Sequence, residues 1–196
     1  IKNIFNEQYA RDISKKVHAS MKTKQRAGEF IGAFASYGYK KSPADKNKLV
    51  IDEYAAGVIR KIFKLYIAGN GKIRIASILN EEGIVCPSEY KKLNGDHYRN
   101  SNRLDSTSYW TYSTVNRILQ NEMYIGNMVQ NKKSQRMRGK SKAQDKEDWI
   151  VVKGTHEAII DDETWNKVQD LLKRRTRNLD LSSNMSIFAG FLKCGD

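Results

Sequence analysis

Apolar residues near the start of the chain recur at every fourth position. Tyr9, Ile13, Val17 and Met21 follow this spacing, which lines one face of an α-helix. No proline interrupts the segment. The pattern therefore predicts one long helix over residues 3–24, which we interpret as the last part of a longer helix.

Two short apolar runs follow the helix. The sequence AFASYGY at 33–39 and the sequence KLVI at 48–51 have the length and composition of strands. Pro43 and Asn47 lie between them, and both residue types favour turns. We expect a small hairpin.

A pair of amphipathic helices is predicted next. Asp52 is a suitable N-cap for the first helix, which ends at residues 69–71. The second runs over 72–82 and closes on Gly83, where a left-handed cap is expected. The apolar faces of the two helices should pack together. The residues of these faces are Ile59, Ile62, Phe63, Tyr66, Ile75, Ile78 and Leu79.

Residues 86–109 are polar, and their apolar residues do not recur with the spacing of a helix or a strand, so we expect a long loop. A third helix opens at residues 110–114 and continues to about Gln120. Its inward residues are Val115, Ile118 and Leu119, and its outward face carries Ser113, Asn116, Arg117 and Gln120.

The last third of the chain predicts two strands, at 124–132 and 148–153, and a fourth helix that begins after Asp161 or Asp162. Residues 177–186 resemble a linker, and residues 187–192 are apolar enough for a strand. The inward residues of the fourth helix are expected to be Trp165, Val168, Leu171 and Leu172. With Trp165, the other two tryptophans, Trp110 and Trp149, are also assigned to the core.

These elements define an α+β fold. A long N-terminal helix precedes a compact mixed domain with a helix-turn-helix-like core and short antiparallel strands. We divide the chain into residues 1–28, the helix with a basic arm; residues 29–177, the main domain; and residues 178–196, a linker with the start of a further domain.

Charge narrows the choice of partner. The 196 residues include 35 Lys and Arg against 22 Asp and Glu, a formal net charge of +13. Such an excess favours a polyanion, and nucleic acid is preferred to a membrane surface because no basic helix carries an opposing Trp, Phe and Leu stripe. No apolar run approaches the roughly 18 residues of a membrane span. We expect a cytoplasmic protein.

The third helix offers the chemistry of base recognition. Asn and Gln can bind adenine with two hydrogen bonds and Arg can bind guanine, each worth roughly 1–3 kcal/mol of discrimination. We therefore assign major-groove contacts to its outward residues, although an ordinary hydrated helix face remains the alternative, since the loop before it exceeds the usual three or four residues. The assigned residues are Ser113, Thr114, Asn116, Arg117 and Gln120.

Two further basic segments are candidates for minor-groove and phosphate contacts. No acidic residue lies between Ile13 and Gly28, or between Glu122 and Asp145. For the first segment, the alternative is a solvated helix end whose cations favour the helix dipole. The assigned residues are Lys15, Lys22, Lys24, Arg26, Lys132, Lys133, Arg136 and Arg138.

An ordered series of residues resembles the recombinase domain of large serine site-specific recombinases, in the style of conjugative-transposon enzymes more than phage integrases. The series covers more than half of the chain. It comprises SYGY at 36–39, AGVIRKIFKLY at 56–66, Ile75, Ala76, Leu79, Asn80, Gly83, Ile84, Trp110, Thr114, Val115, Ile118, Leu119, Asn121, Tyr124, Ile125 and Gly126.

The resemblance implies sequence-specific binding of double-stranded DNA in DNA recombination, including excision and integration of a bacterial mobile element. In that family a separate catalytic domain carries the nucleophilic serine, so we assign no catalytic residue here and expect no activity from this chain alone. The family's long helix matches residues 6–24, its arm crosses the minor groove, and its DNA-bound form is dimeric on each site and tetrameric at synapsis.

The family's next domain is a zinc ribbon, and Cys194 resembles part of its first ligand pair. One cysteine cannot hold structural zinc, so we predict no metal or other cofactor for this chain and expect zinc only with the rest of the ribbon.

Two other functions remain open. A non-enzymatic RNA-binding protein would also be basic, but it would be expected to carry exposed aromatics on a sheet face. A nuclease would need a metal-binding acidic cluster, and residues 161–163 are better explained as a helix cap.

Overall fold

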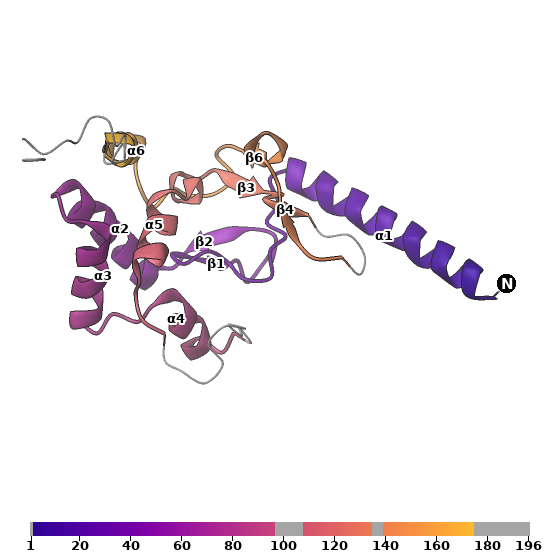
Figure 1. The fold of residues 1–196 in the computed structure, drawn as a ribbon, viewed down its shortest axis with the longest axis horizontal. Helices are drawn as coiled ribbons and strands as arrows, with labels where there is room; N and C mark the ends of the chain where they lie inside the picture. Colours follow the sequence, from indigo (N-terminus) through magenta and orange to yellow (C-terminus); the bar gives the residue numbers. More distant parts are fainter. Residues whose placement is uncertain (1, 97–107, 135–138, 175–196) are drawn as a thin grey trace, which may run out of the picture.

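The computed structural model describes residues 2–96, 108–134 and 139–174 (Figure 1). It confirms the α+β fold, with a long N-terminal helix, a mixed domain and short antiparallel strands. The predicted strand at 187–192, the linker and Cys194 lie outside the described residues.

Helix α1 spans Lys2–Arg26 and projects away from the rest of the molecule (Figure 1). Its apolar stripe forms as predicted but is largely exposed: Tyr9 is 71% exposed, and Ile13, Val17 and Met21 are 44–45% exposed. The C-terminal part of α1 contacts the domain at the strand of residues 150–152, and Val17 and Met21 line a hollow with Ile31.

Three helices form the core of the domain: α2 (Glu53–Ile67), α3 (Lys72–Glu81) and α5 (Tyr112–Leu119). As predicted, Asp52 caps α2, because its Oδ1 accepts a hydrogen bond from the Ala55 backbone N–H. Each fully buried aliphatic or aromatic side chain contributes roughly 1.5–3 kcal/mol. The buried set is Ile59, Ile62, Phe63, Tyr66, Ile75, Leu79, Val115, Ile118 and Leu119, whereas Ile78 is only half-buried.

The fourth predicted helix is α6, Asp162–Arg174. Asp161 caps it, since its Oδ2 accepts a 2.8 Å hydrogen bond from the Thr164 backbone N–H. Trp165 and Val168 are buried against α2, while Leu171 and Leu172 only partly reach the core.

A helix occupies part of the predicted long loop. Helix α4 spans Pro87–Leu93, so the prediction of a loop throughout 86–109 is wrong over these residues. Proline at the first helical turn and Gly95 after the C-cap, with φ +79°, explain its two ends. None of its residues is fully buried.

The predicted hairpin is present but shorter. Strand β1 (Tyr39–Lys41) pairs antiparallel with β2 (Leu49–Ile51). Residues 33–38 are not a strand, which corrects the prediction. The chain turns at Gly38, which has a left-handed conformation with φ +99°. A side chain would not fit at this position, because an added Cβ would lie 2.9 Å from Ile159 Cδ1.

The second predicted strand pair is also shorter than expected. Strand β3 (Met128–Gln130) pairs with β6 (Ile150–Val152). Residues 124 and 125, predicted as the start of a strand, belong to the 3₁₀ helix η1 (Glu122–Ile125), which is capped by Asn121 and ended by Gly126 at φ +83°. A small ladder of β4 (Lys133–Ser134) and β5 (Lys142–Ala143) continues from β3, and the 3₁₀ helix η2 (Lys146–Asp148) precedes β6.

The SYGY segment packs against η1. The Tyr124 hydroxyl donates to the Tyr37 carbonyl at 3.0 Å, and the Tyr39 hydroxyl lies 3.0 Å from the Met123 carbonyl. The Tyr39 and Tyr124 rings are stacked. These contacts join two segments that are more than 80 residues apart in the sequence.

Gln130 fixes the connection after α1. Its Nε2 donates to the Glu29 carbonyl at 2.7 Å, and its Oε1 accepts from the Ile31 backbone N–H at 3.3 Å. The side-chain amide thereby pairs with the backbone as a neighbouring strand would, and it holds the end of α1 beside β3 and β6.

Candidate nucleic-acid interface

Helix α5 is positioned by contacts at its first residues. Thr111 caps it, accepting from the Thr114 backbone N–H. Trp110 is 3% exposed, and its indole N–H donates to the Ile84 carbonyl at 2.8 Å. Asn80 from α3 binds the Trp110 backbone as well. The start of α5 is therefore fixed on the end of α3.

The buried face of α5 leaves the predicted recognition residues outside. Ser113, Arg117 and Gln120 are exposed. Thr114 is half-buried, and its hydroxyl lies 3.1 Å from the Thr111 hydroxyl, so it belongs to the helix cap as much as to the surface. Asn116 is half-buried beside α3. The five residues occupy one helix but not one uniform surface.

Lys72 joins this surface although sequence reasoning missed it. Its Nζ donates a 2.7 Å hydrogen bond to Asn116 Oδ1 and lies 5.4 Å from the centre of the Tyr112 ring. Tyr112 and Asn116 are one turn apart on α5, so Lys72 contacts neighbours on the same helix face. The available signal was the place of Lys72 at the first position of α3, after the Gly71 cap.

The opposite flank of α5 borders a pocket of about 270 Å³ shared with α4. Thr114 and Arg117 line it from α5, Ser88 lines it from α4, and Asn121 closes one side. None of its lining residues among those described is acidic. Hydroxyl, amide and guanidinium donors without a carboxylate suit an anion such as a backbone phosphate.

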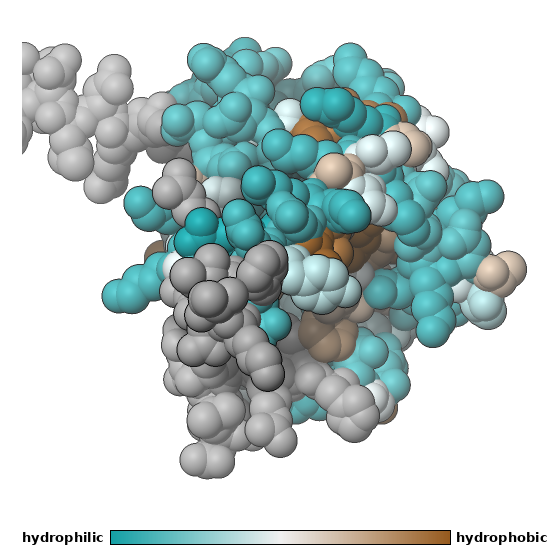
Figure 2. All heavy atoms as spheres, turned by 90° about the vertical axis from the view of Figure 1, so that its right-hand side faces the viewer, coloured by the Kyte–Doolittle hydropathy of each residue, from teal (hydrophilic) through white to brown (hydrophobic). Residues whose placement is uncertain are grey.

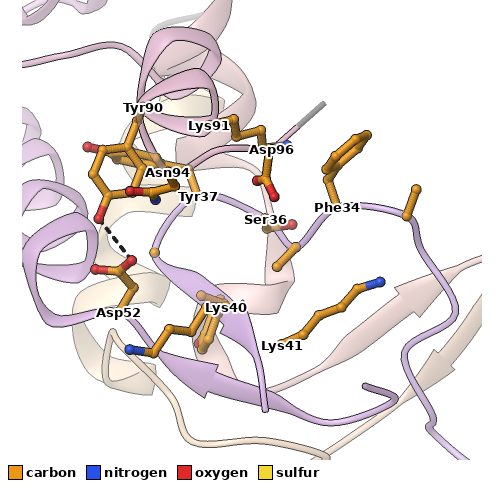
Figure 3. A pocket seen from close by; sticks show the side chains of 14 residues that line it. Phe34, Ser36, Tyr37, Lys40, Lys41, Asp52, Tyr90, Lys91, Asn94 and Asp96 are labelled. Carbon is orange, nitrogen blue, oxygen red and sulfur yellow. Dashed lines mark hydrogen bonds between the residues drawn. The ribbon is translucent and has the colours of Figure 1, made fainter. Parts of the chain in front are cut away.

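A larger pocket of about 460 Å³ lies between residues 33–41 and α4 (Figure 3). Lys40 and Lys41 line it, but so do Asp52 and Asp96, so its charge is mixed. The Tyr90 hydroxyl donates to Asp52 Oδ2 at 2.9 Å, the contact drawn in Figure 3.

Tyr37 also lines this pocket, and its hydroxyl is buried without a hydrogen-bond partner among the described residues. Burial raises the pKa of Tyr37 well above its ordinary value, so the group stays neutral. Tyr37 lines both pockets, so the carboxylates of Asp52 and Asp96 are what make the larger pocket a weaker candidate for an anion than the one beside α5.

The predicted basic residues before Gly28 all lie on α1. Lys15, Lys22, Lys24 and Arg26 are exposed helix residues, so they do not form an extended arm. Lys24 Nζ lies 3.6 Å from a Glu29 carboxylate oxygen and Lys15 Nζ lies 3.9 Å from an Asp12 oxygen, and both pairs are solvent-exposed and therefore weak. Their role on DNA stays a prediction.

The second basic segment is described only in part. Lys133 is exposed on β4, while Arg136 and Arg138 lie outside the described residues. Lys132 is half-buried with its Nζ 5.0 Å from the centre of the Trp149 ring, and burial lowers the pKa of Lys132. Trp149 is half-exposed and its ring contacts the Lys132 ammonium, so its assignment to the core is wrong. Trp110 and Trp165 are buried as predicted.

The predicted contact residues fall into two groups in space. Figure 1 shows α1 at one end of the long axis, β4 near the middle beside the base of α1, and α5 with α2 and α3 toward the other end. Seen from the α1 end, the surface is mostly hydrophilic (Figure 2). The structure does not bring the two groups together into one patch.

Acidic partners are unevenly distributed. On α2, α3 and α6, exposed ion pairs link Arg60 with Glu53, Lys61 with Glu82, Arg74 with Glu81 and Lys167 with Glu163. Arg117 and Lys133 form no ion pair with another described residue. The charges of these two side chains are therefore not compensated by an ion pair within the described residues, and the same holds for Lys22 and Arg26 on α1.

No described group of three or more His, Cys, Asp and Glu residues is arranged to hold a metal ion. Asp161 serves as the α6 cap, and the Thr164 backbone N–H keeps the pKa of Asp161 below its ordinary value. Among the described helices, none is long and apolar enough to cross a bilayer.

Comparison with known proteins identifies the family. Residues 53–175, more than half of the chain, match the family model Recombinase. The chain belongs to this family, which confirms the resemblance to the recombinase domain of large serine recombinases.

Two solved structures match this chain. One, described as "Sequence Requirements of the Listeria innocua prophage attP site", matches with a TM-score of 0.50 and 21% identity over 89% of this chain and 58% of that chain. The other, described as "Crystal Structure of a LSR-DNA Complex", matches with a TM-score of 0.49 and 21% identity over 89% of this chain and 42% of that one. This chain thus spans less than two thirds of either structure.

Proposed function

We propose that this chain binds double-stranded DNA sequence-specifically, as the DNA-binding part of a serine site-specific recombinase that acts on a bacterial mobile element. The observation that carries the proposal is α5, which buries Val115, Ile118 and Leu119 and exposes Ser113, Arg117 and Gln120. Helix α5 is one of the three core helices, and its outer face is polar and cationic. These are the features of a recognition helix in the major groove.

The surroundings of α5 support the same function. The anion-compatible pocket beside Thr114 and Arg117 suits a phosphate next to the groove that α5 enters. The net charge of +13 favours DNA as the partner, and the similar Listeria structure is described by a prophage attP site, which is DNA. The basic residues of α1 and β4 are proposed to contact the minor groove and phosphates farther along the duplex.

In this proposal the chemistry of strand exchange belongs to a catalytic domain outside this chain. We also propose that the complete protein works in the bacterial cytoplasm as a dimer on each DNA site and as a tetramer when two sites are joined. Zinc would belong to a complete zinc-ribbon domain that includes Cys194.

A competition titration tests the proposal. The chain is bound to a fluorescent duplex and displaced by unlabelled duplex DNA, single-stranded RNA or structured RNA over a range of salt concentrations. Duplex DNA should compete best, and log K should fall by roughly 0.9 per log unit of salt for each phosphate contacted. Better competition by either RNA would contradict DNA binding and favour an RNA-binding protein.

A further inference from the structure

The bond between Lys72 and Asn116 determines which atoms Asn116 presents outward. A lysine ammonium group has three donors and no acceptor. The carboxamide atom 2.7 Å from Lys72 Nζ must therefore be the oxygen, Oδ1, because the NH₂ group cannot accept. The orientation of the amide is thus fixed by the chemistry of its partner.

This orientation changes what Asn116 can read. An asparagine that binds adenine uses its oxygen to accept from N6 and its NH₂ to donate to N7. In this chain Lys72 occupies one lone pair of the oxygen, which leaves one lone pair beside the two donors of the NH₂ group. The ammonium of Lys72 has two further donors at the same place. Together the two side chains offer more donors than acceptors.

Lys72 is held in this position by a second contact. Its Nζ lies 5.4 Å from the centre of the Tyr112 ring, a cation–π geometry, and both Lys72 and Asn116 are half-buried. A flexible lysine fixed by two contacts loses less conformational entropy when it meets a ligand. The donor arrangement is therefore present before DNA arrives.

In the major groove, only guanine offers two adjacent acceptors, O6 and N7, whereas adenine combines the acceptor N7 with the donor N6. We infer that Lys72 is a specificity-determining residue, and that the Lys72–Asn116 pair favours guanine over adenine at one base pair, because the excess of donors matches the two acceptors of guanine and the ammonium disfavours the N6 donor of adenine. The inference rests on the proposed insertion of α5 into the major groove. It replaces the adenine contact that an isolated Asn116 would be expected to make.

Selection from a pool of duplexes with a randomised core tests the inference. The whole chain is used, and the bound fraction is sequenced to give a base preference at each position. Wild type should prefer guanine over adenine about tenfold or more at one position, the size of one good base contact. Asn116→Ala should abolish the preference at that position alone.

Lys72→Met should shift the preference at this position from guanine toward adenine, because the ammonium donors are removed and both lone pairs of the amide oxygen become available. Lys72→Arg retains a donor cation and should keep guanine. In the Asn116→Ala background, Lys72→Met should have no further effect on base preference. Lys64→Met, at an exposed lysine on α2, is the matched control and should leave the whole profile unchanged.

Other outcomes separate this inference from the proposed function. If Lys72→Met weakened binding to all duplexes equally with an unchanged profile, Lys72 would be a phosphate contact and the inference would be wrong, while DNA binding would stand. If wild type bound duplexes with no sequence preference, or bound none, the proposed function itself would fail and this inference with it. Unchanged urea unfolding of the Lys72 variants confirms that they fold.

Discussion

Asn80 binds the backbone of Trp110 with both ends of its side-chain amide. Its Nδ2 donates to the Trp110 carbonyl at 3.0 Å, and its Oδ1 accepts from the Trp110 backbone N–H at 2.9 Å. One residue of α3 thus satisfies two backbone groups at the entry to α5. The proposed recognition helix takes its position from this pair.

Removal of the Asn80 amide should loosen α5. Asn80→Ala leaves the Trp110 N–H and carbonyl without these partners, and we expect a loss of about 1–3 kcal/mol in the free energy of unfolding, measured with urea. Asn166→Ala, at an exposed position on α6, is the control and should change the stability by less than about 0.5 kcal/mol. Equal effects of the two substitutions would show that the Asn80 bonds do not stabilise the domain.

Two glycines should respond to alanine in opposite directions. Gly126 has φ +83°, and an added Cβ would lie 2.7 Å from the His156 carbonyl oxygen. Gly126→Ala should therefore cost about 2 kcal/mol or more, from left-handed strain and a backbone clash. Gly57 lies within α2 with nothing within 4 Å of its added Cβ, so Gly57→Ala should stabilise by about 1 kcal/mol. Urea unfolding measures both, and a stable Gly126→Ala chain would refute the close contact.

Stability should fall in mild acid because of His156. Its Nε2 lies 2.8 Å from the Met123 carbonyl, which can only accept, so Nε2 carries the proton, and Nδ1 lies 2.8 Å from the Thr155 hydroxyl. Burial lowers the pKa of His156 below its ordinary value of 6.5. The unfolded chain then binds a proton before the folded chain does. The stabilisation is complete above about pH 6.5 and is lost as pH falls through the folded pKa.

Urea unfolding between pH 5 and pH 8 measures this dependence. His156→Gln should remove its contribution to the pH slope, whereas His18→Gln, on the exposed surface of α1, should leave that contribution in place. An identical pH slope in the wild type and His156→Gln would exclude His156 as its source.

Arg117 and Lys24 should affect DNA binding in different ways. Arg117→Ala should lower the preference for the selected site over random duplex by about tenfold, as expected for a base contact. Lys24→Ala should weaken all duplexes similarly and reduce the salt slope by about 0.9. Fluorescence titrations against both duplexes measure the two effects. Equal weakening by Arg117→Ala would instead assign Arg117 to a phosphate in the pocket beside α4.

Apolar residues that recur at three- and four-residue spacing were sufficient to predict the helical core. Val115, Ile118 and Leu119 are buried as their spacing requires, and Asp52 caps α2 as its side chain allows. Helix α4 was missed because it has only seven residues and no buried side chain, so its sequence shows no helical spacing of apolar residues. Its position depends on partners distant in sequence, such as the contact between Tyr90 and Asp52.

The strands and the site were harder to predict for the same reason. Residues 33–38 have the length and composition of a strand, but the left-handed Gly38 and the packing of Tyr37 on Tyr90 and Trp110 prevent one. The outward residues of α5 could be predicted from the helical spacing of its apolar residues. The role of Lys72, by contrast, depends on how α3 packs beside α5. No local pattern contains that information.

The Gln130 bonds give α1 a mechanical property. A helix of 25 residues is about 37 Å long, and the two hydrogen bonds of Gln130 hold the backbone just beyond its last turn. A rotation of about 10° at this anchor would move the far end of the helix by about 6 Å. A displacement at the end of α1 far from this anchor would therefore correspond to a much smaller movement beside β3 and β6, where Gln130 and Asn47 bind the backbone that follows the helix.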